Sequence, residues 1–590
     1  MERLKNYLNS TYMLYFSLFI VFLMMFFIKN IQFEPIEIGA IRKILHPEYA
    51  KGELYFATYD PIFHYDYIVA IVARLFGNGN NYLNLAKVFW FFETGLSVWI
   101  LIKICNYVFK NDRMILGISI ITFLLLNSGE TDQKTMARPL YLLAMYFFVK
   151  NKWIASAVFG ATIFYLHIGL AIWWFLSSCF GLAIMYLLYK KISLKQIIKY
   201  IVVVTIFAAP MLYFYIGKTA GSELEGFSIE YYYYVCGVAT SVLLTLSNGF
   251  IGWMSPLMVF ALFFVGYRKA KESGYTNGNI VSIVIGVLII YVVDFIFADV
   301  LHNTAVISLQ LLRSILHVEF FSNLFLSFIL AKQIKKGNYF FCFVLLLIFL
   351  PYGILESYFF IRKDIALIVF YCILVIYEIF ERYINSYLEE IFKTLNGKFD
   401  LTLVKEYTRK GHWLLQKPII IVIFVIFLIF PKLPLLKASI QTVLGIPQNK
   451  NSTSWNKHEN MYNDIARFVN EKINGKEVLL IIPFVENDFG YYVNHRIFPN
   501  FDSILYFANN ETNFKDILEN DLHSSIKQLF EDGANNLRKK WEVLWKDLDE
   551  DIILRWKERH GVTHVIRENE LPLNFPIIYQ NQFYTVYNIS

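Results

Sequence analysis

The sequence predicts an α-helical polytopic membrane protein with about thirteen transmembrane helices and a small external α/β domain at its C-terminus. Its 590 residues are 57% hydrophobic and only 17% charged, whereas soluble domains are about 45–50% apolar and about 25% charged. Apolar runs of membrane-crossing length recur as far as residue 435, and the composition becomes polar beyond Pro447. We therefore expect a transmembrane domain over residues 1–446 and an external α/β domain over residues 447–590.

Each predicted span is an apolar run. About 20 apolar residues cross a bilayer, and shorter runs need tilt or local thinning of the membrane. The first run, Tyr12–Ile28, lacks a small-residue cleavage site and is interpreted as a retained span. Residues 231–246 could form a further span or a re-entrant segment. The predicted spans are residues 12–29, 84–108, 114–127, 138–150, 153–167, 169–189, 197–216, 247–267, 279–298, 317–332, 338–352, 364–381 and 417–435.

The orientation follows from Lys and Arg, which cluster at alternate ends of the spans. Cytoplasmic loops carry an excess of these residues, so we expect the clusters and the N-terminus inside a bacterial or archaeal plasma membrane. This explains the net charge of +7 and indicates no nucleic-acid partner. Loop 381–416 should lie along the anionic inner leaflet, and an odd number of spans places the C-terminal domain outside. The clusters are residues 1–5, 103–113, 150–152, 190–199, 268–271 and 332–336, and the outer loops are residues 30–83, 128–137, 217–246 and 299–316.

The C-terminal region predicts one small α/β domain. It has no cysteine, no glycine-rich phosphate-binding motif and no His/Cys metal spacing, so we expect a recognition or capping role. The predicted elements are a helix over Asn460–Asn474, a buried strand over Glu477–Pro483, an extended piece over Arg496–Pro499, helical sequence over Asn513–Arg559, and closing strands over Val562–Ile566 and Ile577–Tyr587 around a turn at Leu571–Pro576.

The first outer loop, residues 30–83, is rich in acidic residues and lies between two membrane-length apolar runs. Its interleaved aromatic residues indicate that it folds down onto the bundle. Two interpretations stay open: an active-site loop, and an ordinary solvated connector with interfacial aromatic side chains. The candidate catalytic carboxylates are Glu34, Glu37, Asp60 and Asp66.

The second outer loop and the spans after it add candidate binding residues. Glu130, Asp132 and Arg138 are expected at the mouth of the bundle. Arg138-Pro139 suits the first turn of a span, where proline costs no hydrogen bond and backbone N–H groups can bind an anion. The alternative is a hydrated loop with a helix-starting proline. His167, near an outer end, either contributes to a site or is a satisfied core histidine.

Charged residues also occur around the outer loop 299–316. Asp294 and Asp299 are five residues apart, which in an α-helix places them on different faces, so we do not expect them to form one site by themselves. Arg313 stands at an expected outer end, against the charge bias. It either pairs with an acid or binds a phosphate, for which its planar guanidinium is suited.

Together these features resemble the GT-C superfamily of multi-pass glycosyltransferases, which use lipid-phosphate-linked sugars as donors. The shared features are a first span followed by a long acidic outer loop, many short spans, an ARP motif after the third span and a C-terminal external α/β domain. The resemblance implies that Glu34 or Glu37 is the catalytic base or a metal ligand, and the segment YDPIFHYD adds Asp60 and Asp66. The adjacent Asp-Glu or Asp-Asp pair of many active members is missing from this loop.

The favoured hypothesis is a membrane glycosyltransferase that moves a sugar from a polyprenyl-phosphate donor to an envelope or extracellular glycan on the outer face. Arg138 or Arg313 would bind the phosphate, with Glu130, Asp132 and His167 as further binding residues. Carboxylates would suit Mg²⁺ or Mn²⁺, although no ligand set can be drawn. The rival hypothesis is a transporter, a flippase or a non-catalytic assembly subunit, against which the lack of a convincing internal repeat counts. The sugar, lipid, acceptor and oligomeric state stay open.

Overall fold

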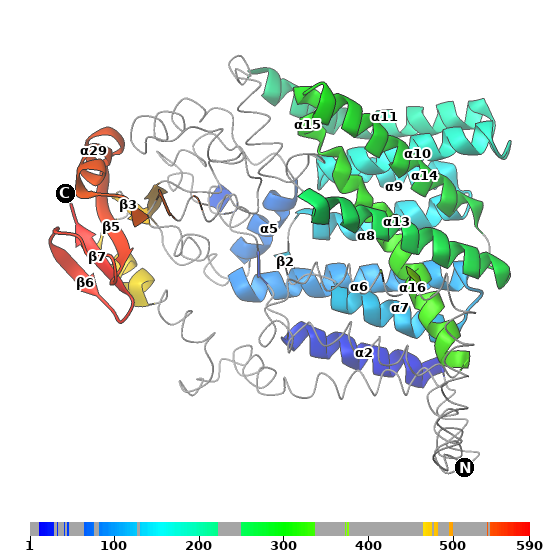
Figure 1. The fold of residues 1–590 in the computed structure, drawn as a ribbon, viewed down its shortest axis with the longest axis horizontal. Helices are drawn as coiled ribbons and strands as arrows, with labels where there is room; N and C mark the ends of the chain where they lie inside the picture. Colours follow the sequence, from blue (N-terminus) through cyan, green and yellow to red (C-terminus); the bar gives the residue numbers. More distant parts are fainter. Residues whose placement is uncertain are drawn as a thin grey trace, which may run out of the picture.

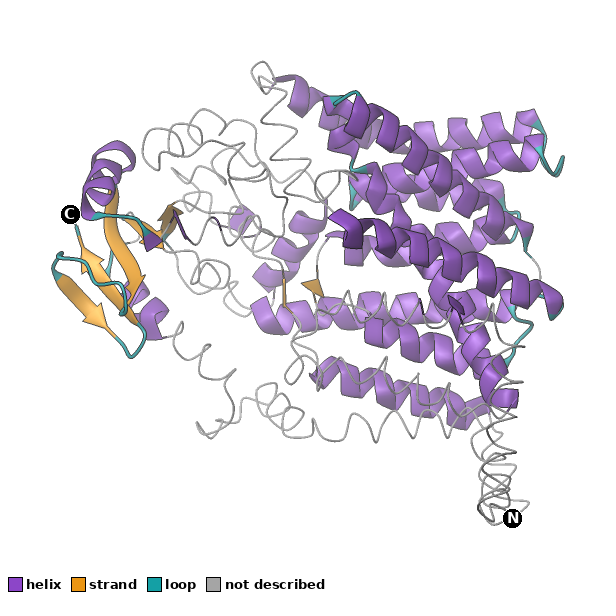
Figure 2. Cartoon of the chain, in the orientation of Figure 1, coloured by secondary structure: helices purple, strands orange, loops and turns teal. Residues whose placement is uncertain are grey.

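The computed structural model contains a bundle of helices and, beyond one of its ends, a small β-sheet (Figures 1 and 2). The residues that the structure describes are 11–28, 32–33, 41, 44–45, 64–75, 82–126, 130–131, 133–221, 249–275, 277–336, 372, 375–376, 464–474, 477–481, 495–498, 540, 543–544 and 546–589.

The bundle helices coincide with the first ten predicted spans. They are α2 (Thr11–Ile28), α6 (Tyr82–Val108), α7 (Arg113–Leu126), α8 (Gln133–Val149), α9 (Trp153–Thr162), α10 (Ile168–Leu187), α11 (Leu194–Gly221), α13 (Gly249–Glu272), α14 (Gly278–Asp294) and α16 (Ile315–Lys336).

Membrane-crossing length is established for part of this set. Within the described residues, five helical segments are long and apolar enough to cross a bilayer, and three shorter apolar helices accompany them. The protein is therefore an integral membrane protein. The last three predicted spans fall almost entirely outside the described residues, so a total of about thirteen stays a prediction.

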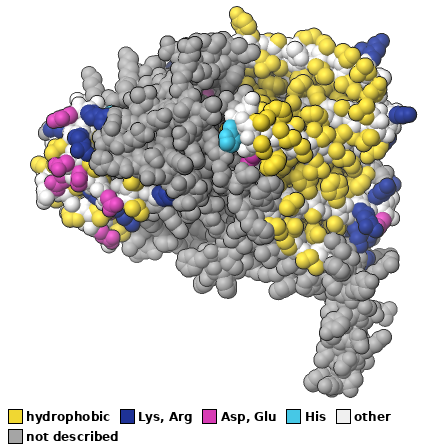
Figure 3. Space-filling view, turned by 45° about the horizontal axis from the view of Figure 1, so that its top comes forward, with side chains coloured by type: hydrophobic (Ala, Val, Ile, Leu, Met, Phe, Trp, Pro, Cys, Tyr) yellow, Lys and Arg dark blue, Asp and Glu magenta, His cyan; other side chains and the backbone are white. Residues whose placement is uncertain are grey.

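The predicted cytoplasmic clusters between residues 103 and 336 lie at one end of the bundle, which we call the basic end; cluster 1–5 is outside the described residues. Lys110 Nζ donates to the carbonyl of Gly274 at 3.2 Å, and Lys335 Nζ lies 2.5 Å from an Asp112 carboxylate oxygen. Figure 3 shows Lys and Arg side chains at this end and a hydrophobic flank beside it. The helices therefore alternate in direction as the charge pattern predicts, while the side that faces the cytoplasm stays a prediction.

The opposite end, which we call the loop end, carries shorter elements. They are β1 (Gln32–Phe33), α5 (His64–Leu75), β2 (Glu130–Thr131), the 3₁₀-helix η2 (Ile163–Tyr165) and an irregular connection from α14 to α16 through the π-helix η4 (Phe295–Val300), α15 (Thr304–Leu309) and the 3₁₀-helix η5 (Leu311–Ser314).

Glycines allow α10 and α14 to approach closely. A Cβ at Gly286 would lie 2.6 Å from the carbonyl oxygen of Ser177, and a Cβ at Gly181 would lie 3.3 Å from the Ser282 backbone. Small residues at helix interfaces in membranes permit such backbone contact, and α10 and α14 form the most extensive helix pair among the described residues.

We expect Gly286→Ala to destabilise the bundle, because the added methyl group would overlap a backbone oxygen that cannot move alone. Overpacking of this kind costs about 1–3 kcal/mol. Gly95→Ala is the matched control, since a Cβ there has nothing within 4 Å and alanine gains up to about 1 kcal/mol in helix propensity. Thermal unfolding in nanodiscs measures both variants. Equal unfolding temperatures for Gly286→Ala and Gly95→Ala would show that the close contact between α10 and α14 does not contribute to the stability of the bundle.

The C-terminal sheet has five strands in the order β4 (Arg496–Phe498), β3 (Val478–Ile481), β5 (Val562–Glu568), β7 (Tyr584–Asn588) and β6 (Ile577–Gln580). Helical residues 464–472 cover it through Ile465 and Val469, which pack on Leu479. Figure 1 shows the sheet beyond the loop end, on the side away from the basic end. The parallel strands are β3, β4 and β5, and β6 and β7 are antiparallel neighbours.

Local sequence explains the end of this domain and corrects one expectation. Asp549 caps α29 (Glu550–His560) by accepting the N–H of Ile552 at 2.8 Å, and Gly561 ends the helix at φ 69°. The closing strand expected over Ile577–Tyr587 is instead a hairpin of β6 and β7. Asn581 Oδ1 accepts two backbone N–H groups, at 2.9 Å each, and so forms the turn.

Candidate active site

Two strands join the first and second outer loops. β1 and β2 pair in parallel, with Gln32 opposite Glu130 and Phe33 opposite Thr131, and both strands contact α6. Glu34 follows β1 in the sequence and Asp132 follows β2. These two residues, together with Glu37 and Asp60, lie outside the described residues, so their placement stays a prediction. The structure does show that the loops carrying the candidate acids start from one strand pair.

Helix α5 contacts α6 through an aromatic pair. Its Tyr65 ring packs edge-on against Phe89, with centroids 6.4 Å apart. Asp66, a candidate catalytic carboxylate, is fully buried on the same helix together with Val69. A buried ionisable group near a membrane surface is paired or functional by default. Asp66 is therefore on a buried face of α5 and not on an open surface of the loop.

Arg138 lies in α8 and is half-buried. The expectation that Arg138-Pro139 forms the first turn is wrong, because the helix already begins at Gln133 and Pro139 is inside it. The backbone N–H groups of the first turn thus belong to residues preceding Arg138. Any anion contact at Arg138 must come from its guanidinium.

One turn further along α8 a buried polar pair connects this helix to α16. The hydroxyl of Tyr141 and Nδ1 of His317 form a hydrogen bond of 2.5 Å, and the rings stack at 5.0 Å. Trp174 from α10 packs edge-on against both rings. His317 is fully buried and Tyr141 is 6% exposed. Sequence reasoning missed this pair, although a histidine within an apolar span is itself a signal.

Arg313 lies in η5, between α15 and α16, and is half-buried. It precedes His317 by four residues, just as Arg138 precedes Tyr141 by three. Because Tyr141 and His317 are hydrogen-bonded, and both helices start at the loop end, each arginine lies about one turn beyond the same contact. Both predicted phosphate-binding residues therefore precede residues of one buried contact, while their joint role in a site stays a prediction.

Three acidic residues lie along this part of the chain. Asp294 and Asp299 are both buried and interact electrostatically. The expectation of separate faces assumed an α-helix, but Phe295–Val300 is a π-helix, in which hydrogen bonds link residues five apart. Glu319 on α16 interacts electrostatically with the hydroxyls of Tyr141 and Tyr291. Sequence reasoning did not single out Glu319.

His167 has a structural role in the fold. It is the N-cap of α10, and its Nδ1 accepts the backbone N–H of Leu170 at 2.9 Å. Its ring lies 5.9 Å from that of Trp173. A cap of this type satisfies an otherwise unbonded donor of the first turn. Participation in substrate binding stays a prediction.

A second missed acid lies deeper in the bundle. Glu93 in α6 is 2% exposed, next to the buried Thr94. Ionisable residues inside membrane helices are rare and mark functional sites or internal pairs. Glu93 is therefore a further candidate in the helix that contacts β1 and β2.

Within the described part of the chain, neither a metal site nor the cavity at the basic end adds to this set. Among the described residues, no group of three or more His, Cys, Asp and Glu side chains could hold a metal ion. A cavity of about 340 Å³ lies at the basic end, lined in part by Lys152, Gln196 and Lys199. It is at the opposite end of the bundle from Arg138 and Arg313.

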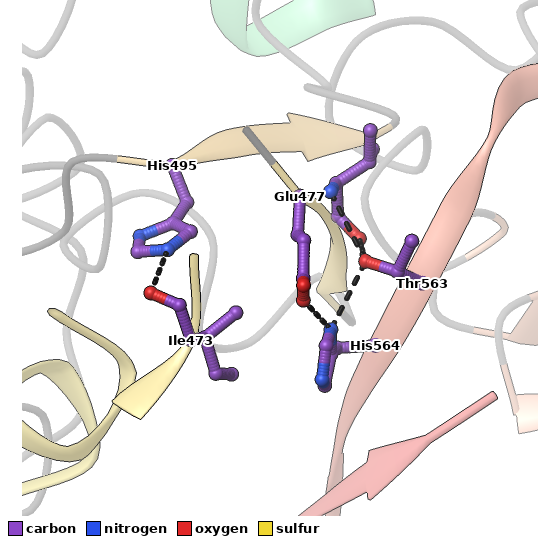
Figure 4. Close-up of polar contacts among 6 residues, drawn as sticks. Ile473, Glu477, His495, Thr563 and His564 are labelled. Carbon is purple, nitrogen blue, oxygen red and sulfur yellow. Dashed lines mark hydrogen bonds and ion pairs between the residues drawn. The ribbon is translucent and has the colours of Figure 1, made fainter. Parts of the chain in front are cut away.

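Two buried histidines, His495 and His564, lie on either side of Glu477 in the C-terminal domain (Figure 4). His564 Nδ1 lies 3.0 Å from a Glu477 carboxylate oxygen, and His495 Nε2 lies 3.2 Å from the carbonyl oxygen of Ile473. Burial lowers the pKa of both histidines. For His564, the neighbouring His495 also lowers the pKa and Glu477 opposes the shift. Both imidazoles are therefore neutral near pH 7.

We expect acid to destabilise the C-terminal sheet. An unfolded histidine titrates near pH 6.5, and the folded pKa values lie below this. The stabilisation is complete above about pH 6.5 and is lost as the pH falls toward the folded pKa values, because the unfolded state binds protons first. Hydrogen exchange of Val562–Glu568 in the full chain, corrected for the pH dependence of the intrinsic rates, measures the stability of the sheet at each pH. His495→Gln/His564→Gln should flatten the pH dependence. A wild-type profile that is flat from pH 7 to 5 would contradict the expectation.

The membrane bundle, the loops joined by β1 and β2 and the C-terminal sheet belong to an integral membrane protein, and the fold resembles that of a solved GT-C glycosyltransferase. The solved structure of ArnT from Cupriavidus metallidurans bound to undecaprenyl phosphate, a GT-C glycosyltransferase, is similar over 97% of both chains, with a TM-score of 0.50 and 10% identity. The apo-state structure of the same ArnT gives a TM-score of 0.46 and 11% identity over 97% of both chains. No protein-family model and no curated protein sequence matches the chain.

Proposed function

We propose that this protein is a membrane glycosyltransferase that takes a sugar from a polyprenyl-phosphate donor at the loop end of the bundle. The observation that carries the proposal is the GT-C-like fold over almost the whole chain, shared with a protein whose structure contains undecaprenyl phosphate. Arg138 and Arg313, one turn beyond the Tyr141–His317 bond, supply the positive charge that a lipid phosphate requires.

The chain's residues would act as follows. Glu34 or Glu37 removes the proton of the acceptor hydroxyl, whose oxygen attacks the anomeric carbon. The bond from that carbon to the donor phosphate oxygen breaks, and polyprenyl phosphate leaves with the electron pair. A placed base contributes about 10²–10⁴-fold in rate, and fixed positive charge at the leaving phosphate contributes more. The acceptor is proposed to be an envelope or extracellular glycan, with the basic end in the cytoplasm.

Binding of undecaprenyl phosphate tests the proposal without knowledge of the sugar. The purified full chain in nanodiscs should bind this lipid and discriminate against undecaprenol, which lacks the phosphate. A photoreactive undecaprenyl phosphate should label peptides that contain Arg138 or Arg313. Equal binding of both lipids, or labelling confined to the basic end, would refute the proposed donor site and favour a transporter or assembly role.

A further inference from the structure

The segment that carries Arg313 has an irregular backbone between α14 and α16. It passes from the π-helix η4 to the short helices α15 and η5, and two of its non-glycine residues, His302 and Gln310, have left-handed φ angles of 50° and 49°. Left-handed conformations cost non-glycine residues about 1–2 kcal/mol each. Helices this short also leave most of their carbonyl groups without internal partners. The segment therefore depends on contacts from outside itself.

Three aromatic side chains from three different helices bond to this segment or to the first turn of α16 that follows it. Trp173 Nε1 of α10 donates to the carbonyl of Leu309 at 2.8 Å, and the Tyr291 hydroxyl of α14 donates to the carbonyl of Leu312 at 2.9 Å. The third is Tyr141 of α8, bonded to Nδ1 of His317 at 2.5 Å. We call Tyr141, Trp173 and Tyr291 the aromatic clamp.

The contacts of the clamp bracket Arg313 in sequence. They fall four residues before it, one residue before it and four residues after it. The backbone of Arg313 is itself bonded to Gln310, its N–H donating to that carbonyl at 3.0 Å. An arginine side chain is long and flexible, so its useful position depends on how firmly its backbone is fixed.

We propose that the aromatic clamp positions Arg313 beside Arg138 so that the two guanidinium groups bind one lipid phosphate. This rests on the proposed function and names Tyr141, Trp173 and Tyr291 as positioning residues for it. Tyr141 has a special place among them, because it bonds His317 of α16, four residues after Arg313, and lies one turn from Arg138 on α8. Trp173 also touches the ring of His167, so the N-terminus of α10 is linked to the same segment.

The test compares Tyr291→Phe and Trp173→Phe with a matched control. Each variant keeps the ring volume or most of it and removes one donor to a backbone carbonyl. Tyr200→Phe is the control, because it also removes a buried hydroxyl bond, to Ser178 Oγ at 2.8 Å, but in α11 near the basic end. Hydrogen exchange of the Thr304–Ser314 backbone measures how firmly the clamp holds the segment. The Kd for undecaprenyl phosphate measures how well the proposed site binds the lipid.

We expect Tyr291→Phe to speed exchange of Thr304–Ser314 and to raise the Kd for undecaprenyl phosphate about tenfold, since small displacements of a charged contact are costly. Tyr200→Phe should match the wild type in both. In an Arg313→Ala background, Tyr291→Phe should cause no further loss of binding, because the residue that it positions is gone. A further loss in that background, or a wild-type Kd in Tyr291→Phe, would overturn the proposal.

The same data separate this proposal from the proposed function. If the wild type binds no undecaprenyl phosphate, the proposed function has failed and the phosphate role of the clamp fails with it. If the wild type binds the lipid but the clamp variants bind equally well, only the clamp proposal is refuted. Unchanged exchange in Trp173→Phe and Tyr291→Phe would show that neither side chain holds the segment.

Discussion

Glutamine in place of both Glu34 and Glu37 is expected to abolish sugar transfer while the protein still folds and inserts. The substitution keeps the shape and hydrogen bonding of the side chains but removes the proton acceptor, so the loss should reach about 10²–10⁴-fold or more. Only one of the two single variants need be inactive, and that one identifies the base. Product formation by the purified protein, normalised to its amount in the membrane, is the measurement.

The control for this double variant is binding of the donor lipid. Glu34 and Glu37 are proposed to act on the acceptor, so undecaprenyl phosphate should bind the double variant as it binds the wild type. Product formation at the wild-type level by the double variant would refute this mechanism. The first outer loop would then be interpreted as a solvated connector.

Alanine in place of Arg313 should weaken donor binding more than it slows the chemical step. Loss of a hydrogen bond to a charged group costs about 1.5–3 kcal/mol, which corresponds to roughly a tenfold to 150-fold increase in Kd. Arg313→Lys should recover only part of the affinity, because an ammonium group does not reproduce the planar guanidinium fork. The Kd for undecaprenyl phosphate measures both.

Arg268→Ala is the matched control for Arg313→Ala. Arg268 is at the basic end, its side chain is 81% exposed, and its pair with Glu272 is a surface contact within one helix, which contributes little. Full affinity in Arg313→Ala, or an equal loss in Arg268→Ala, would contradict a phosphate role for Arg313.

Much of the architecture follows from local sequence. The apolar run 84–108 predicts α6 at Tyr82–Val108, and the run EVLLIIP predicts β3 at Val478–Ile481. Such elements are specified by hydrophobic length and periodicity within a short window. The grouping of the basic clusters at one end follows from the same alternation of charge.

Other features depend on contacts that no short window contains. Tyr141 and His317 are 176 residues apart, so their bond cannot be read from local periodicity. The early start of α8 at Gln133 and the π-helix at Phe295–Val300 also escape periodicity, because both depend on how the loop end packs. Individual residues such as Arg138 and Arg313 are thus recognisable by type, whereas only the fold shows that both precede residues of the Tyr141–His317 contact.

The most direct measurement of the central claim is mass spectrometry of membrane lipids from cells that lack this protein and from cells that carry it. A glycosyltransferase of the proposed kind consumes a sugar-bearing polyprenyl phosphate, so that lipid should accumulate in the deletion strain. The wild-type gene should return it to its normal level, and the Glu34→Gln/Glu37→Gln variant should not. An unchanged level of every glycosylated polyprenyl phosphate, or full correction by the double variant, would contradict the account.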